Sequence, residues 1–193
     1  MTSGPGGWLG LGPVHQIAVV TEDLDRSIAR RQTDEAASEW RGWVYDADLL
    51  GWQQIDGVAA VYSMRVAVAG TNPQLELVQP TGGDTSLSRV LAGAQRAGAG
   101  TARRPGHVTE TLHHLGLFVD DFEAEQRRLT RLGIPCLESG GGHGLDGDGC
   151  FGYFDTVDRF GVLVELIQPP ARRPEPHFVM TAHPPGSTAE EPV

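Results

Sequence analysis

The chain contains an internal repeat, and this repeat limits the folds open to it more than any other feature does. The segment HQIAVVTEDLD, which begins at His15, is matched by HHLGLFVDDFE, which begins at His113. Further along each copy, QLELVQP from Gln74 is matched by LVELIQP from Leu163. Self-similarity of this kind predicts two copies of one supersecondary unit that share a core.

Four polar side chains hold equivalent places in the two copies. In each copy, the first lies seven residues before an aspartate and the second lies four residues before a proline. They are Gln16 and Glu76 in the first copy, and His114 and Glu165 in the second. The matched spacing favours a shared role for the four.

The two glutamates lie inside short apolar runs rich in Leu, Val and Ile. A lone carboxylate in such a run is costly to bury unless a positive charge compensates it, and a metal ion would do so. The alternative is that strand alternation places each glutamate on a solvated face. Because that alternative must hold at all four matched positions, the pattern favours a metal site.

The register of the two leading strands leaves an alternative open. A slip of one residue would turn His15 and His113 toward the site and turn Gln16 and His114 away from it. The spacing to the following aspartate favours Gln16 and His114. His15 and His113 are then expected to be partly exposed histidines at the strand ends.

On these motifs, residues 13–170 resemble the vicinal oxygen chelate superfamily, which includes glyoxalase I, methylmalonyl-CoA epimerase, extradiol dioxygenases and bleomycin-resistance proteins, and are closest to its glyoxalase-like domains. The resemblance implies an α+β fold in which two tandem βαβββ modules form a cup-shaped mixed sheet. It also implies that the first and last strands of each module supply the ligands of a divalent metal ion: Zn, Ni, Co, Fe or Mn. Those positions are Gln16, Glu76, His114 and Glu165.

The expected organisation has four parts. Residues 13–80 form the first module with an aromatic insertion, 81–110 a helix and linker, 111–170 the second module, and 171–193 a flexible proline-rich tail. Asp23 and Asp121 are expected to cap one helix in each module, and the first of these is expected to extend to Trp40. Gly133 is expected to end the second helix.

The resemblance also implies an activity. A divalent ion would polarise a substrate carbonyl, and Glu165 or Glu76 would take a proton from the neighbouring carbon, which gives an isomerase, epimerase or lyase acting on a carbonyl compound or thioester. With only one clear histidine ligand, the set argues against an extradiol dioxygenase, whose iron site uses two. The alternative is a metal-free protein of the bleomycin-resistance type that binds an antibiotic or natural product in the same cup.

Several side chains are expected to contact the small-molecule substrate. The predicted lining of the cup is Val20, Val78, Phe118, Tyr153 and Ile167. The insertion between Gln32 and Asp56 carries four further aromatic residues that could line the mouth or form a small core of their own: Trp40, Trp43, Tyr45 and Trp52. His143, in a glycine-rich loop, is a possible substrate contact.

Composition excludes some partners. The net charge of −10 leaves no basic surface typical of nucleic-acid binding or of an anionic membrane surface. No apolar run reaches the length of a membrane span, and no targeting signal is visible, so a cytoplasmic protein is expected. A homodimer is possible, because an exposed module edge would favour pairing between chains.

Overall fold

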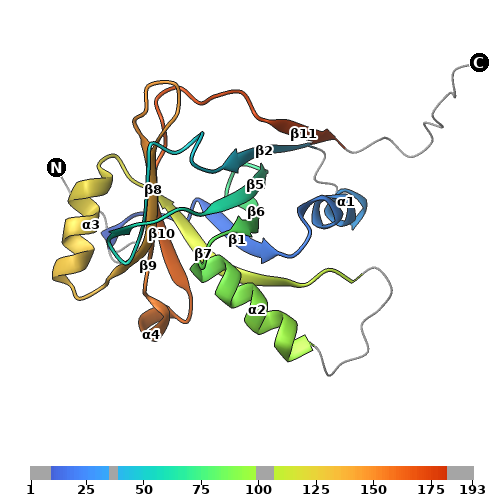
Figure 1. Ribbon diagram of the computed structural model, residues 1–193, viewed down its shortest axis with the longest axis horizontal. Coiled ribbons are helices and arrows are strands. Elements are labelled where there is room, and N and C mark those ends of the chain that lie inside the picture. Colours follow the sequence, from blue (N-terminus) through green and yellow to red (C-terminus); the bar gives the residue numbers. More distant parts are fainter. Residues whose placement is uncertain (1–9, 35–38, 99–106, 182–193) are drawn as a thin grey trace, which may run out of the picture.

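The computed structural model describes residues 10–34, 39–98 and 107–181. Its eleven strands form one curled, mixed sheet in the order β11-β2-β5-β6-β1-β7-β10-β9-β8-β3-β4 (Figure 1). The first module consists of β1 (Gln16–Thr21), α1 (Leu24–Asp34), β2 (Glu39–Tyr45), β5 (Ser63–Ala69) and β6 (Gln74–Gly82). The second consists of β7 (Glu110–Phe118), α3 (Phe122–Arg131), β8 (Cys136–His143), β9 (Gly149–Phe154), the short helix α4 (Val157–Phe160) and β10 (Leu163–Gln168).

The two modules have the same internal pairing and meet along their first strands. In each, the last strand runs parallel to the first: β6 beside β1, and β10 beside β7. Strand β1 pairs antiparallel with β7, which joins the modules into one half-barrel. The predicted α+β fold with two βαβββ modules is therefore confirmed.

Local signals define the two module helices. The Asp23 carboxylate accepts a hydrogen bond from the backbone N–H of Arg26, and Asp121 does the same for Ala124 at 2.8 Å. Gly133 follows α3 with φ +75°, a conformation that glycine adopts without strain.

The expected extension of α1 to Trp40 is wrong. Helix α1 ends at Asp34, and Trp40 lies on β2, fully buried in a cluster that also contains Leu24 and Ile28. The three side chains meet because helix α1 packs on the sheet. Their spacing in the sequence matches a helical period only by coincidence.

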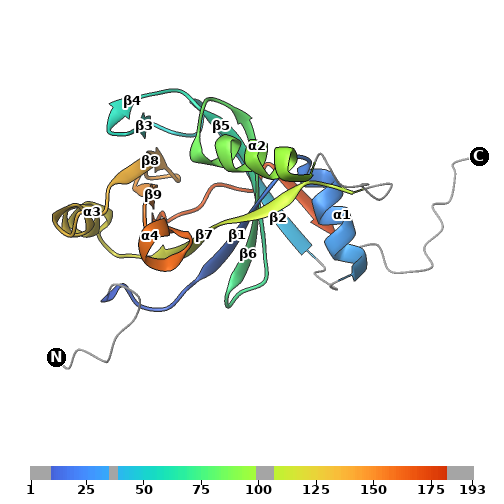
Figure 2. The same cartoon turned by 90° about the horizontal axis from the view of Figure 1, so that it is seen from below.

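The segment between the modules closes one end of the half-barrel. Helix α2 (Ser86–Gly98) lies across the strands of the first module (Figure 2). Its Leu87 and Leu91 pack in one cluster with Val20 and Val78 of the sheet. Strand β6 continues to Gly82, inside the range expected for the helix and linker, while residues 99–106 of the predicted linker lie outside the described residues. Helix α2 is therefore part of the core.

Both module edges are extended by strands from the other part of the chain. The aromatic insertion does not form one long loop, because it supplies β2 and β3 (Trp52–Ile55). Strand β3 forms a hairpin with β4 (Val58–Ala59), just after the insertion, and pairs with β8 of the second module. Strand β11 (Phe178–Thr181) pairs with β2 of the first module. Within the range expected to be a flexible proline-rich tail, residues 178–181 thus form an edge strand, and residues 182–193 lie outside the described part. No helix among the described residues is long and apolar enough to cross a membrane.

Candidate metal centre

Strand register brings Gln16 and Glu165 to one level of the sheet. Gln16 on β1 lies opposite Gly116 on β7, and Gly116 lies opposite Glu165 on β10. The glycine leaves open the space between the two polar side chains, since a Cβ atom there would lie 2.9 Å from Gln16 Cβ and 3.1 Å from Ile167 Cδ1. Because residue 116 has no side chain, the side chains of Gln16 and Glu165 can point into the same space.

Glu76 and His114 meet at the next level. Ala18 on β1 lies between them, opposite Glu76 of β6 on one side and His114 of β7 on the other. In both modules the glutamate on the last strand is therefore two residues out of register with the polar residue on the first strand. The sequence repeat is thus also a repeat of strand register.

Glu76, His114 and Glu165 form a compact buried group. His114 Nε2 lies 3.1 Å from Glu76 Oε2 and 3.0 Å from Glu165 Oε2. One potential ligand atom from each residue lies within 4.8 Å of the others, and all three residues are buried. Two carboxylates and an imidazole suit a divalent ion such as Zn²⁺, Ni²⁺, Co²⁺, Fe²⁺ or Mn²⁺.

Two unsatisfied oxygen atoms support this fit. Gln16 Nε2 donates to Gln74 Oε1 at 2.9 Å, and this bond leaves Gln16 Oε1 buried without a hydrogen-bond partner in the described part of the chain. Glu165 Oε2 also lacks a bond of acceptable geometry there, despite its short distance to His114. Buried polar atoms are rarely left without a partner, and a cation between these oxygens would satisfy both.

The charges of the group depend on one another. Burial disfavours the charged form of His114, but Glu165 and Glu76 outweigh this effect and raise its pKa to about 9. Burial raises the pKa of Glu165 to about 7, although His114 opposes the shift. In the protein without a metal, a proton on His114 thus partly offsets the carboxylates, and a bound cation would replace that proton.

A second histidine orients the first. Strand β7 has a bulge at which Ala18 faces His114 and Val19 faces Leu112, so His113 is an extra residue and turns inward with His114. His113 Nδ1 lies 2.9 Å from His114 Nδ1, and its Nε2 lies 3.1 Å from Ser86 Oγ.

Burial and the charge of His114 hold the pKa of His113 well below its usual value, so this ring is neutral and its Nδ1 accepts from His114. The bond leaves His114 Nε2 facing the carboxylates, as a metal ligand requires.

The two flanking histidines differ in burial. His113 is 3 % exposed, so the expectation that it is partly exposed is wrong, and the bulge is the reason. His15 is half-buried, stacks on Phe118 and accepts a hydrogen bond from the Phe118 N–H. The structure thus places Gln16 and His114 at the site, in the register that the spacing favoured.

A hollow, the interior of the cup, lies beside the Glu76–His114–Glu165 triad on the concave side of the sheet. It measures about 750 Å³ when the space open to solvent is included. Of the predicted substrate contacts, Phe118, Tyr153 and Ile167 line it, and so does His143. Val20 and Val78 do not: both are fully buried, because they lie deeper in the half-barrel where α2 covers them.

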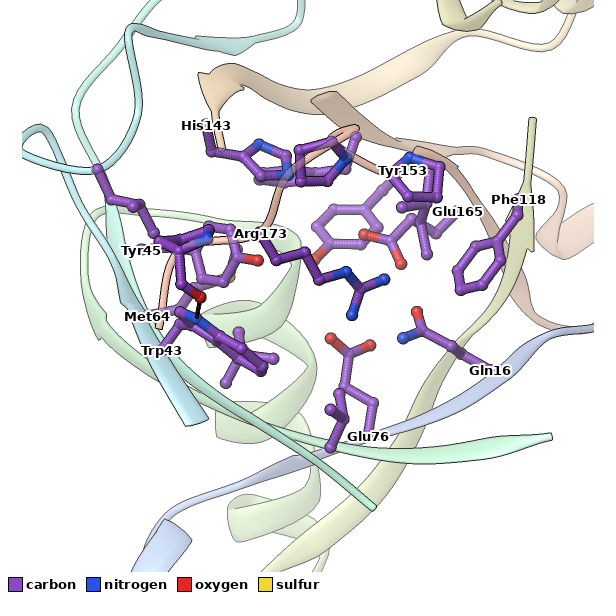
Figure 3. Close-up of a pocket in the computed structure, with 18 residues that line it drawn as sticks. Gln16, Trp43, Tyr45, Met64, Glu76, Phe118, His143, Tyr153, Glu165 and Arg173 are labelled. Carbon is purple, nitrogen blue, oxygen red and sulfur yellow. Dashed lines mark hydrogen bonds between the residues drawn. The ribbon is translucent and has the colours of Figure 1, made fainter. Parts of the chain in front are cut away.

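The aromatic insertion contributes to this hollow in part. Trp43 and Tyr45 of β2 line it, Trp40 lies in the core behind the sheet, and Trp52 is 41 % exposed on β3. Sequence reasoning missed Arg173, which follows β10 and points toward Gln16 and the two glutamates (Figure 3). Its only sequence signal is an arginine pair set between prolines in a segment otherwise expected to be a tail.

Comparison with known proteins agrees with this architecture. Residues 15–154 match the family model described as the Glyoxalase/Bleomycin resistance protein/Dioxygenase superfamily, and the chain belongs to that superfamily. A search of curated proteins found no match.

The fold is similar to solved structures of methylmalonyl-CoA epimerase. One single-residue variant from Streptomyces coelicolor, in complex with 2-nitronate-propionyl-CoA, aligns with a TM-score of 0.56 at 18% identity over 85% of this chain and 99% of that one. A second variant from the same organism, with the same ligand, gives 0.57 at 17% identity over 85% and 99%. A methylmalonyl-CoA epimerase in complex with methylmalonyl-CoA and NH4+ gives 0.55 at 18% identity over 85% and 99%. At these identities the likeness shows the fold.

Proposed function

We propose that this protein is a divalent-metal-dependent enzyme that removes a proton beside the carbonyl group of a small ketone, acid or thioester, as an epimerase, isomerase or lyase. The observation that carries the proposal is the buried Glu76–His114–Glu165 group, with the unsatisfied oxygens of Gln16 and Glu165 beside it at the wall of the cup. Burying two carboxylates and an imidazole together lowers stability unless their charges are compensated. A bound cation would supply that compensation, and a metal site would explain why the group is buried.

The donor set suits the chemistry. A divalent ion held by Gln16, Glu76, His114 and Glu165 would polarise a carbonyl oxygen and stabilise the negative charge that forms there when the neighbouring carbon loses a proton. Glu165 and Glu76 both line the cup, so either can reach a substrate bound in it and hold the proton between its removal and its return.

The cup wall would position the substrate. Burial and Glu165 raise the pKa of Tyr153 far above its usual value, so the Tyr153 hydroxyl keeps its proton and remains a hydrogen-bond donor in the cup. Phe118 and Ile167 supply apolar surface on the neighbouring strands. These side chains exclude water from one side of the reacting group.

The titles of the structural neighbours suggest one substrate class to test. Those proteins are methylmalonyl-CoA epimerases, and one is in complex with methylmalonyl-CoA. The structural likeness makes an acyl thioester a reasonable first candidate for this chain, beside simple 2-oxo acids.

Metal binding is the first test. The parent, Glu76→Gln and Glu165→Gln are titrated with Zn²⁺ after chelator treatment, with Glu123→Gln as a control because that carboxylate is exposed on α3. We expect about one ion per parent chain. Loss of a ligand should weaken binding by about a hundredfold or more, beyond the effect of losing an outer hydrogen bond, while Glu123→Gln should bind like the parent.

Proton exchange is the second test. The metal-loaded parent is incubated in D₂O with methylmalonyl-CoA and with a panel of 2-oxo acids, and deuterium incorporation is followed by NMR. We expect exchange with at least one substrate, and the loss of the proton-carrying glutamate should slow it by about 10²–10⁴-fold. A parent that binds no metal after reconstitution would overturn the proposal.

A second function is favoured by a different observation. Five aromatic side chains line the cup: Trp43, Tyr45, Phe118, Phe151 and Tyr153. Such a lining would stack against a planar antibiotic or natural product without a metal or turnover. In that case aromatic ligands should quench Trp43 fluorescence equally in chelator-treated protein, in Glu76→Gln and in Glu165→Gln.

A further inference from the structure

The segment after β10 crosses the mouth of the cup and is held on both sides. On the side of the second module, Arg172 pairs with Asp146 and the Ala171 N–H donates to Asp148 at 3.0 Å. On the side of the first module, Trp43 Nε1 donates to the Pro174 carbonyl at 3.3 Å. Figure 1 shows the chain running from β10 over the sheet to β11. Residues 169–177 thus form a strap whose two ends are fastened to different modules.

Arg173 lies between these two fastenings and aims into the cup. In Figure 3 its guanidinium points toward the carboxylates of Glu76 and Glu165 and the amide of Gln16. Among the described residues that line the cup, Arg173 is the only arginine or lysine. Within the part of the chain that the structure describes, Arg173 makes no ion pair or hydrogen bond, unlike the neighbouring Arg172.

The charge of Arg173 affects the pKa values of two side chains that line the cup. Burial is the main cause that lowers the pKa of His143 to about 4, and the charge of Arg173 lowers it further. Burial and Glu76 raise the pKa of Tyr45 well above its usual value, whereas Arg173 acts in the opposite direction. Arg173 is itself exposed to solvent at the mouth of the cup, and its charge acts on these two side chains of the lining.

With a divalent ion bound, the site and Arg173 together would carry one net positive charge. A divalent ion and the carboxylates of Glu76 and Glu165 sum to zero, and burial keeps His143 neutral. Arg173 then remains as one positive charge without an ion-pair partner among the described residues, at the exposed mouth of a hollow whose walls are largely apolar or aromatic. A ligand with one negative charge would complete the balance, whereas a neutral ligand would leave the cation unpaired.

We infer that Arg173 binds the carboxylate of the substrate, so that the enzyme acts on carbonyl compounds carrying a carboxylate near the acidic carbon. A guanidinium matches a carboxylate with two parallel hydrogen bonds, and this geometry fixes orientation as well as charge. The class includes 2-oxo acids and malonyl-type half-thioesters. The inference rests on the proposed function, and it makes Arg173 a specificity-determining residue.

The test compares an acid with its neutral counterpart. Phenylpyruvate and its methyl ester are titrated by calorimetry into the parent, Arg173→Met, Arg173→Lys and Arg172→Met, each with and without Zn²⁺. Arg172→Met is the matched control, because it removes an adjacent arginine that fastens the strap outside the cup.

We expect Arg173→Met to weaken phenylpyruvate binding about tenfold or more and to leave ester binding within about twofold of the parent. Arg173→Lys should recover part of the loss, and Arg172→Met should weaken acid and ester alike and only slightly. The inference would be overturned if Arg173→Met lost the same affinity for phenylpyruvate as for its methyl ester, or if it bound phenylpyruvate as tightly as the parent does.

Metal affinity separates this inference from the proposed function. Zn²⁺ binding by Arg173→Met should equal or exceed that of the parent, since a nearby positive charge has been removed. If the parent binds no Zn²⁺, the metal-enzyme proposal fails by itself, while the acid–ester comparison in metal-free protein still decides the role of Arg173.

Discussion

His143 shows how a single residue is tuned by its surroundings. It is 7 % exposed, its ring lies edge-on to Tyr45 at a centroid distance of 5.6 Å, and its Nδ1 has no hydrogen-bond partner among the described residues. Burial and the charge of Arg173 lower its pKa to about 4. The folded protein therefore holds His143 neutral at a pH where an unfolded chain would protonate it.

This shift predicts a pH dependence of stability. Between the unfolded pKa of about 6.5 and the folded pKa of about 4, the unfolded state binds more protons at residue 143, so stability falls as pH falls through this window. At pH 5 the contribution is about 2 kcal/mol relative to pH 7.

This pH dependence is checked by measuring the free energy of unfolding in urea for the parent and for His143→Gln, each at pH 7 and at pH 5. The parent should lose about 2 kcal/mol more than the variant, because His143→Gln removes only this titration. Equal losses in the two proteins would show that residue 143 does not carry the effect.

At the scale of elements, the candidate site follows from two small residues in the central strands. Ala18 and Gly116 stand between the polar side chains that converge, one in each module. The parallel pairing of first and last strands sets a two-residue offset, and the antiparallel β1–β7 pairing brings the two modules' polar residues to adjacent levels. The site is assembled within one chain.

Gly116→Ala tests this arrangement. The added Cβ would lie 2.9 Å from Gln16 Cβ and 3.0 Å from Gln16 Oε1, so the amide must move out of the site. We expect a loss of about 1–3 kcal/mol in the free energy of unfolding and weaker Zn²⁺ binding.

Gly93→Ala is the matched control, because a Cβ on that α2 residue meets nothing within 4 Å. It should leave metal affinity unchanged and slightly stabilise the helix. If Gly116→Ala binds Zn²⁺ as tightly as Gly93→Ala, the site does not depend on the glycine.

At the scale of the whole molecule, the two modules are tied together by exchanged strands. The β3–β4 hairpin of the first module extends the second, and β11, which follows the second module, extends the first. The edges of β8 and β2 are therefore paired within the chain. What remains at the two ends of the sheet are the short strands β4 and β11.

Removal of β11 should uncover the edge of β2. In the parent, Phe178 of β11 covers Gly42 and stacks under Arg65, with the guanidinium carbon 5.1 Å from the ring centroid. A chain ending at Pro176 should therefore lose about 2–4 kcal/mol of stability and self-associate through the open edge.

Unfolding and sedimentation measurements check this, with a chain ending at Thr181 as the control that keeps β11. A shortened chain that remains as stable and as dispersed as this control would contradict the role given to β11.

Much of this protein could be predicted from the sequence alone. The repeat determined the two modules, the aspartates at 23 and 121 determined where two helices begin, and the matched spacing selected the residues that meet at the triad. These features are readable because they depend on strand period, capping and spacing, which act over a few residues.

Only the tertiary structure decided how deep each residue lies in the half-barrel, which element covers it, and which residues stand at the mouth of the cup. Strand alternation indicates which face a residue lies on but not how far along the half-barrel it lies or what covers it, and so Val20 and Val78 were placed in the cup although α2 buries them. The bulge that turns His113 inward and the strap that delivers Arg173 likewise depend on partners distant in sequence. Such contacts leave no local period, because packing between remote segments selects shape and charge without imposing a spacing on the chain.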